Sequence, residues 1–383
     1  MRLVFVEKRT DTLTNERRKD NVNNNFKRMI TGILSLTMVL SLAACGGGAS
    51  TPTASSAPTE GEKVEIRIAS SSPTVEFNGE GTTALGVCVN YFVKEIEARS
   101  NGRITAKVFP DGQLASSSEE YIGGLQNGAF DIGIMNNGSW SDYTNAFAGL
   151  NIPYLYFDFD TVYAVLDSDL GESWKQKAQE DTTVIPLAYF DIGFRELTNS
   201  VREVKTPDDL KGIKLRTMVD DIQMAAWEAL GTAVTPVAYS ELYTALQQKM
   251  VDGQENPVSN IVSSKVYELQ PYMTMTNHNY TATIPAASPI FWNKLSAEDQ
   301  KLVQEVMIEA QNKGREKTAV FADAFIKTIA DSGVKIYEPT TEELQLFQDK
   351  VKTVWTKVEE NMGTDNYNAL ITFVDEYTAS HAK

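Results

Sequence analysis

Polar side chains that suit anion binding follow several apolar, strand-like runs of this sequence. They are Arg216 at the end of IKLR, Arg195 in GFRELTNS, Asn256 at the end of VDGQEN, and Asn136 after DIGIM. A guanidinium donates two parallel charge-assisted hydrogen bonds to a carboxylate, a geometry that lysine cannot reproduce. Open α/β sheets bind ligands at the carboxyl ends of their strands. The pattern predicts a site for a small organic acid, although either arginine alone could instead form an ordinary salt bridge.

The chain has too few histidines for most catalytic sites that depend on this residue. It contains two histidines, His278 and His381, and the second lies at the C-terminus. These residues cannot build a Ser-His-Asp or Cys-His site, an HExxH zinc helix or a paired-cysteine metal site. We interpret His278 as structural and predict that the protein is not an enzyme. The alternative is an exported lyase or hydrolase that acts on organic acids.

Two motifs match cofactor or metal sites only loosely. GEGTTA, residues 79–84, fits G-x-G-x-x-A but does not follow directly on a strand. YFDFD, residues 156–160, is acidic but lacks the alternating oxygen ligands and the glycine of a calcium loop. The sequence contains no G-x-x-x-x-G-K-[ST] phosphate loop. We therefore predict no cofactor and no metal.

Charge and length narrow the class of protein. The net charge of −16 repels nucleic acids and anionic membrane surfaces at long range, so we predict no nucleic-acid partner. The 383 residues, 42% of them apolar, are enough for two well-packed domains.

The first residues have the pattern of an export signal. A basic stretch precedes the apolar run Met29–Ala44, and LAAC resembles the lipobox of bacterial lipoproteins. This resemblance implies a lipoprotein signal over residues 1–45, in which Cys45 receives a diacylglyceryl group and becomes the new N-terminus after cleavage. The protein would then be attached to the outside of the bacterial membrane, at the cell surface or in the periplasm. Residues 46–62, rich in Gly, Ser, Thr and Pro, would be a flexible tether. An uncleaved signal anchor is the alternative, and translation could begin later than Met1, for instance near Val22 if its codon is an alternative start.

From residue 64 onward, strand and helix patterns alternate. The first set has strands at 64–70, 103–109 and 129–138 with helices at 83–100 and 117–128, a β-α-β-α-β unit. Cys88 lies within the first helix and is expected in the core, so the mature chain can form no intramolecular disulfide. A second set has strands at 183–189, 194–200, 213–217, 232–237 and 251–257 and helices at 221–230 and 240–250. Two sets predict two lobes with a cleft between them.

Two long helical patterns follow. Residues 295–331 contain no proline, and their apolar residues recur at helical spacing. A helix of this length would span roughly 55 Å and could brace both lobes. Residues 340–363 form a second amphipathic pattern, which begins with an N-cap threonine and glutamates.

Over residues 63–380 the chain closely resembles the solute-binding proteins of tripartite ATP-independent periplasmic (TRAP) transporters, the dicarboxylate-binding-protein family. The motifs that carry the resemblance are FPDGQLA, GLQNGAFDIGIM, GFRELTNS, TPDDLKGIKLRTM and VAYSELYTALQQKMVDGQENP. It implies an α/β, two-lobe, periplasmic-binding-protein-like (type II) fold with hinge strands and one long helix spanning both lobes. We expect residues 63–192 plus 281–320 in lobe I, and residues 193–280 plus 321–383 in lobe II.

The resemblance also implies roles for individual residues. Arg216 would bind the ligand carboxylate, Arg195 would contribute a second guanidinium, and Asn256 would also bind the ligand. Tyr239 in VAYSE matches an aromatic wall position. Asn136 and Ser71 match polar positions of the opposite lobe. The implied partners are a small organic acid and the membrane subunits of the transporter, and we expect the protein to be a monomer.

Two sequence differences from other members of this family limit the range of possible ligands. Asn136 stands where some sialic-acid-binding members have a glutamate, which disfavours sialic acid. Asp220 and Asp221 could accept hydrogen bonds from hydroxyl groups, which favours a sugar acid such as a uronate or aldonate. A C4-dicarboxylate, with Arg195 holding its far end, remains the alternative, as does an organic-acid receptor outside TRAP transport.

Overall fold

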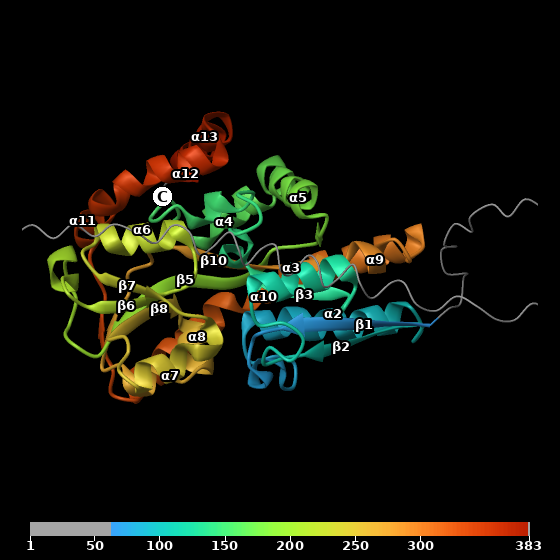
Figure 1. The fold of residues 1–383 in the computed structure, drawn as a ribbon, viewed down its shortest axis with the longest axis horizontal. Helices are drawn as coiled ribbons and strands as arrows, with labels where there is room; N and C mark the ends of the chain where they lie inside the picture. Colours follow the sequence, from blue (N-terminus) through green and yellow to red (C-terminus); the bar gives the residue numbers. More distant parts are fainter. Residues whose placement is uncertain (1–62, 382–383) are drawn as a thin grey trace, which may run out of the picture. The chain divides into compact units, whose positions relative to one another are not determined.

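The computed structural model describes residues 63–381, and its strands form one mixed sheet (Figure 1). Cys45 and the expected tether lie outside the described residues. The strand order is β2-β1-β3-β10-β5-β8-β6-β7. These strands are β1 (Val64–Ser70), β2 (Ile104–Phe109), β3 (Ile132–Asn136), β5 (Phe190–Asn199), β6 (Lys214–Thr217), β7 (Ala233–Pro236), β8 (Gly253–Pro257) and β10 (Tyr280–Ala287). Off this path lie β4 (Ile185–Pro186), β9 (Tyr272–Thr274) and β11 (Lys335–Tyr337).

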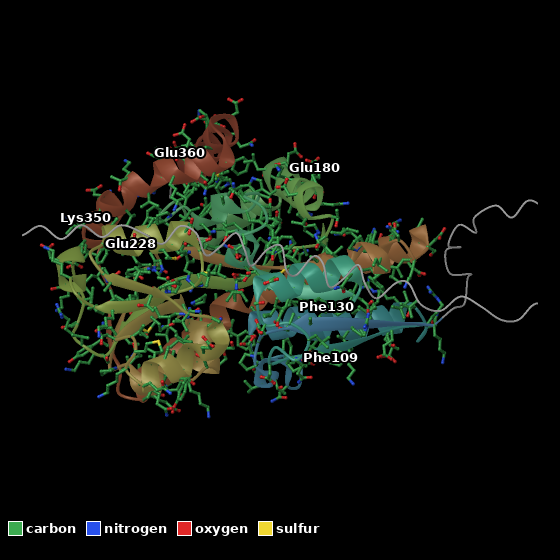
Figure 2. The ribbon with its side chains drawn as sticks, viewed as in Figure 1. Phe109, Phe130, Glu180, Glu228, Lys350 and Glu360 are labelled. Carbon is green, nitrogen blue, oxygen red and sulfur yellow. The ribbon has the colours of Figure 1, made fainter. Side chains whose placement is uncertain are left out.

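Helices cover both faces of the sheet. They are α2 (Ala84–Arg99), α3 (Ser118–Asn127), α4 (Phe159–Leu166), α5 (Asp169–Thr182), α6 (Asp221–Ala229), α7 (Leu242–Gln247), α8 (Val258–Ser263), α9 (Pro289–Trp292), α10 (Ala297–Asp331), α11 (Thr341–Val351), α12 (Trp355–Met362) and α13 (Thr364–His381). Charged side chains such as Glu180, Glu228 and Glu360 point outward, whereas Phe130 is buried (Figure 2). Within residues 63–381, no helix combines the length and apolar character needed to cross a bilayer.

The first lobe is built on parallel strands. β1 pairs in parallel with β2 and β3, as the β-α-β-α-β pattern predicts. Ile66, Ile68 and Ile132 pack with Cys88 and Phe92 of α2 in one buried cluster. Apolar residues on both sides of these strands are expected, because helices cover both faces of a parallel sheet.

The second lobe repeats this arrangement around β6. β6 lies between β7 and β8, in parallel with both, and β8 pairs antiparallel with β5. Its core joins Leu215 of β6 to Trp227 of α6 and Phe347 of α11. Core packing therefore fixes the position of β6, and Arg216 lies near the carboxyl end of this strand.

Two antiparallel strands connect the lobes. Residues Phe190–Phe194 of β5 pair with β10, while Arg195–Asn199 pair with β8. β10 also pairs with β3. The pairing register shifts between Thr281 and Ala282, opposite Gly193, whose φ of 112° suits glycine. These strands are the hinge that the resemblance implies.

The long helix α10 contacts both lobes. Ser296 caps its N-terminus by accepting a hydrogen bond from the Asp299 amide. Val306 and Ala310 pack in the cluster of the first lobe, whereas Ile329 packs with Leu246 and other apolar residues of the second. The predicted two-lobe fold with one spanning helix is confirmed.

Two predicted elements differ from the structure. The expected strand at 183–189 is reduced to the short β4. The expected strand at 194–200 begins earlier, at Phe190, because the bulge at Gly193 allows β5 to continue through this glycine. The predicted helix at 340–363 is interrupted by a 3-10 turn at Lys352–Val354. Val351 packs in the core with Phe347, whereas Val354 packs in a different core, so the chain turns between them.

The C-terminal helices pack against elements that follow β3. Val358 of α12 and Leu370 and Val374 of α13 share a cluster with Trp140 and Val162. Residues 355–381 thus contact elements of the segment 63–192, which we expected in lobe I. The lobe boundaries stay a prediction.

Candidate ligand-binding site

A cavity of about 390 Å³ lies between the two sets of strands, a size that suits a small molecule. All the predicted binding residues line it: Ser71, Asn136, Arg195, Arg216, Tyr239 and Asn256. The hinge strands contribute Ile192, Thr281 and Thr283 to its wall. The structure thus brings together predicted residues that are up to 185 positions apart in the sequence, Ser71 and Asn256 being the extremes of that set.

Arg216 is a buried charged group of this cavity that has no ionic partner among the described residues. The side chain is 2% exposed, and its Nε and Nη2 donate to the carbonyl oxygen of Val237 at 2.9 and 2.6 Å. Among the described residues, no carboxylate lies within salt-bridge distance of it, and its Nη1 donates no hydrogen bond. Burial lowers the pKa of Arg216 to about 10, so it is still a cation at neutral pH. An unpaired buried cation favours an anionic ligand.

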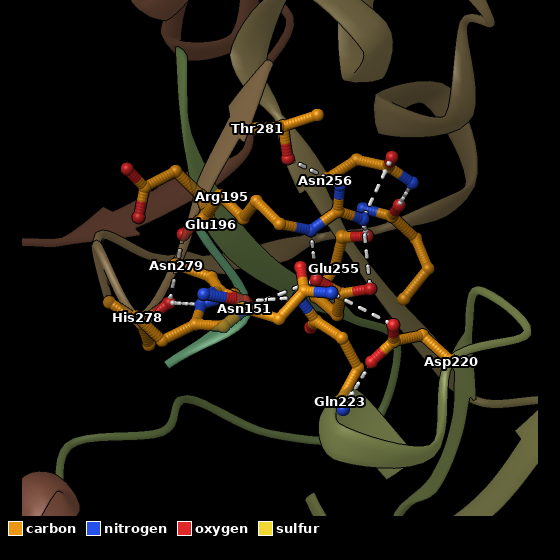
Figure 3. Close-up of polar contacts among 12 residues, drawn as sticks. Asn151, Arg195, Glu196, Asp220, Gln223, Glu255, Asn256, His278, Asn279 and Thr281 are labelled. Atoms are coloured by element: carbon orange, nitrogen blue, oxygen red, sulfur yellow. Dashed lines mark hydrogen bonds and ion pairs between the residues drawn. The ribbon is translucent and has the colours of Figure 1, made fainter. Parts of the chain in front are cut away.

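Arg195 has its charge neutralised inside the protein (Figure 3). Its Nε and Nη2 form a bidentate ion pair with the carboxylate of Glu255, and Nη1 donates to Thr281 Oγ1 at 3.0 Å. Burial would raise the pKa of Glu255, but the charge of Arg195 and a hydrogen bond from His278 outweigh it and lower the pKa to about 2. The sequence indicated either a ligand contact or a salt bridge, and the salt bridge is present.

His278 has the structural role that we predicted. Its Nε2 donates to Glu255 Oε2 at 3.0 Å, and its Nδ1 accepts from Thr276 Oγ1 at 2.8 Å. Burial lowers the pKa of the imidazole, so the ring is neutral. His278 does not line the cavity and instead holds Glu255 in place.

Asn256 and Tyr239 line the cavity but are also engaged within the protein. Asn256 Oδ1 accepts from Arg195 Nη2 at 3.1 Å, and its Nδ2 donates to Gln254 Oε1 at 2.5 Å. The hydroxyl of Tyr239 lies 3.4 Å from the carbonyl oxygen of Asn260, and burial raises its pKa to about 12. Tyr239 is therefore a neutral wall residue, as expected, whereas Asn256 positions Arg195.

The opposite wall is rich in hydroxyl and amide groups. Asn136 Oδ1 accepts from the amide of Ser139 at 3.0 Å, which leaves its Nδ2 without a partner among the described residues. Ser71 lies directly after β1, and further serines line the same wall at positions 72, 116, 117, 118 and 139. Ser117 also caps α3 by accepting a hydrogen bond from the Glu120 amide, a local role that does not account for the neighbouring serines. Their clustering in SSSEE was the signal that sequence reasoning missed.

Asp220 and Asp221 do not line this cavity, so the expectation that they meet ligand hydroxyls is wrong. Asp220 caps α6 by accepting from the amides of Ile222 and Gln223, and it also accepts from Asn151 Nδ2 at 2.9 Å. The side chain of Asp221 is 83% exposed and lies 3.6 Å from Lys357 Nζ. Aspartate directly before a helix is a common N-cap, and that local role accounts for Asp220.

Within residues 63–381, no group of three or more His, Cys, Asp or Glu side chains is placed to hold a metal ion. The buried polar groups of the cavity are one free guanidinium, one paired guanidinium, amides and hydroxyls, while the carboxylates of Glu119 and Asp142 line it from exposed positions. This arrangement can bind and orient an organic anion.

Known proteins share both the sequence and this fold. Residues 76–361 match the family model described as bacterial extracellular solute-binding protein, family 7. A solute-binding protein of Verminephrobacter eiseniae is 35% identical over 229 residues, which cover 60% of this chain and 67% of that protein.

Two solved structures of similar proteins contain bound organic acids. One is a sugar acid binding protein from Advenella mimigardefordensis in complex with galactonate, with 27% identity, a TM-score of 0.77 and coverage of 83% of this chain and 99% of that one. The other is a TRAP periplasmic solute binding protein from Sulfurospirillum deleyianum with bound succinate, with 27% identity, a TM-score of 0.74 and coverage of 81% and 98%.

These matches confirm the predicted class, a transport-related binding protein rather than an enzyme. They also agree with the organic-acid chemistry of the cavity. The chain belongs to family 7 of the bacterial extracellular solute-binding proteins, the receptors of TRAP transporters.

Proposed function

We propose that this TRAP receptor captures a hydroxylated monocarboxylate, a sugar acid such as an aldonate or a uronate. The observation that carries the proposal is the charge balance of the cavity. Arg216 is unpaired, whereas Arg195 is neutralised by Glu255. One surplus buried positive charge matches one carboxylate, because each unpaired buried charge costs several kcal/mol.

The serine wall supplies the second half of the argument. Hydroxyl groups at Ser71, Ser116 and Ser139 and the free Nδ2 of Asn136 face the same cavity. Hydroxyls and amides can each donate and accept, as the hydroxyls of a sugar acid require. This wall replaces the two aspartates as the source of hydroxyl contacts, and the galactonate complex of the similar protein supports the same ligand class.

Ligand capture would close the two lobes. Arg216 and Tyr239 lie on one side of the cavity and Ser71 and Asn136 on the other, so their combined contacts exist only when the lobes are together. A ligand that binds both lobes stabilises the closed state by its difference in affinity for the two states. The closed receptor would then deliver the acid to the membrane subunits of the transporter.

A calorimetric titration against galactonate, glucuronate, erythronate and succinate tests the ligand class. We expect a sugar acid to bind most tightly, and Arg216→Lys to weaken its binding by about tenfold or more, because lysine loses the bidentate geometry. Arg202→Lys is the matched control, because the exposed side chain of Arg202 donates, among the described residues, only to the Asp209 carbonyl oxygen. Tightest binding of succinate would favour the dicarboxylate alternative, and unchanged affinity in Arg216→Lys would remove Arg216 from the site.

The lipid anchor on Cys45 is part of this proposal and would tether the receptor near its transporter. Two acyl chains hold a protein stably at a membrane, whereas one does not. Cys45→Ser should move the protein from the membrane fraction to the soluble fraction. Continued membrane association of this variant would argue for an uncleaved signal anchor instead.

A further inference from the structure

A second cavity lies on the other face of the hinge strand β5. Its volume is about 170 Å³. Arg195 lines the ligand-binding cavity, whereas its neighbours Phe194 and Glu196 line the second one, because successive side chains of a strand point to opposite faces. We call it the hinge pocket. One strand separates it from the site of the organic acid.

The walls of the hinge pocket are largely apolar and come from distant segments. α10 contributes Phe321 and Phe325, and Met275 follows β9. Phe159 begins α4, and Val258 begins α8. Phe159 also stacks edge-on against Phe194, with ring centroids 5.1 Å apart. The pocket therefore offers aromatic faces on two sides to a small apolar group.

One carboxyl group lines this apolar pocket. Glu196 is 2% exposed, and its Oε2 accepts from the amide of Asn277 at 2.9 Å. No other residue that lines the hinge pocket is titratable. Outside the pocket, burial and, to a smaller extent, the charge of Glu196 raise the pKa of the Tyr154 hydroxyl. Burial raises the pKa of Glu196 to about 8, so its charge is strongly destabilised while no cation is near.

We propose that the hinge pocket binds a small apolar amine, with its ring between Phe194, Phe321 and Phe325 and its ammonium group on the Glu196 carboxylate. The size is suitable, because an apolar cavity of about 150 Å³ holds benzene. A cation would relieve the cost of ionising Glu196 in an apolar setting, and aromatic faces attract cations as well. The pocket thus selects the opposite charge from the ligand-binding cavity.

Occupancy of the hinge pocket would alter binding of the organic acid. Ala84 and Phe159 come from elements that pack with the first set of strands, whereas Val258 and Met275 come from the second set. Hinge movement must therefore change the pocket. An amine that binds one lobe arrangement better changes the affinity for the acid, and the acid changes the affinity for the amine by the same factor.

Benzylamine and its neutral counterpart benzyl alcohol are the probes, titrated into the mature protein by calorimetry without organic acid. We expect benzylamine to bind, and Glu196→Gln to weaken it by about tenfold or more while benzyl alcohol is unaffected, because only the ammonium needs the carboxylate. Ala322→Phe, which fills the pocket from α10, should abolish binding of both probes.

Glu119→Gln is the matched control, because it removes a carboxylate that lines the ligand-binding cavity instead. Benzylamine binding that survives Glu196→Gln but is lost in Glu119→Gln would overturn the proposal, as would equal binding in the wild type and Ala322→Phe. Thermal melting of each variant without probe establishes that it is folded. Failure of these titrations would leave the organic-acid titrations untouched, because the two sets use different probes.

Discussion

At the scale of single residues, Glu255 sets the charge of the ligand-binding cavity. Its carboxylate is fully buried and receives both the Arg195 guanidinium and the His278 ring. With a pKa of about 2 it stays ionised at any physiological pH. Removing this charge would leave two unpaired guanidinium groups beside one cavity.

Glu255→Gln is therefore expected to have two effects. Folding stability should fall by about 3–5 kcal/mol, because Arg195 becomes a buried charge without a partner. The ratio of succinate to galactonate affinity should rise, because the second cation can now pair with a second carboxylate. Thermal melting and paired calorimetric titrations measure these quantities, and an unchanged affinity ratio would contradict the charge-balance argument.

At the scale of elements, the position of α10 depends on a glycine. A Cβ at Gly314 would lie 2.2 Å from Cys88 Sγ of α2 and 3.1 Å from the carbonyl oxygen of Ala84. The two helices cross so closely there that only a residue without a side chain fits. Gly123 in α3 is a helical glycine with no atom within 4 Å of such a Cβ.

The two glycines should respond oppositely to alanine. Gly314→Ala is expected to destabilise the protein by about 1–3 kcal/mol through overpacking. Gly123→Ala should stabilise it by about 0.5–1 kcal/mol, because alanine loses less conformational entropy in a helix. Chemical denaturation of both variants provides the test. Stabilisation by both substitutions would show that α10 can move away from α2.

Sequence patterns predicted most of these elements, because apolar periodicity is local. Strand-end chemistry and the family resemblance together predicted the six residues that line the cavity. Sequence patterns could not predict which distant side chains and strands pair with one another. Nothing near Arg195 in the sequence indicates that Glu255 takes its charge, and the bulge that lets β5 continue through Gly193 depends on pairing with β10. The helix at 340–363 divides because Val351 and Val354 reach different cores, which only the tertiary structure defines.

At the scale of the whole molecule, several elements join the two lobes, and the chain also passes from one core to another between Val351 and Val354. The hinge strands β5 and β10 and the helix α10 pass between them, and the ligand-binding cavity and the hinge pocket lie on opposite faces of β5. A movement that narrows one cavity therefore changes the other.

Closure should be visible in solution. Addition of a bound sugar acid is expected to reduce the radius of gyration measured by small-angle X-ray scattering, because the closed state is more compact. Arg216→Gln should abolish the change at the same ligand concentration. Equal scattering curves with and without ligand, at a concentration that calorimetry shows to be saturating, would argue against lobe closure.

The burial of Cys88 has a practical consequence for such measurements. Its thiol is 0% exposed, and burial raises its pKa well above the usual range, so it should not react with maleimides in the folded protein. In a soluble form that begins after Cys45, Cys88 is the one remaining cysteine of the sequence. A cysteine introduced on each lobe could then be labelled selectively with spin or fluorescent probes, with no need to replace a native thiol that packs against Gly314.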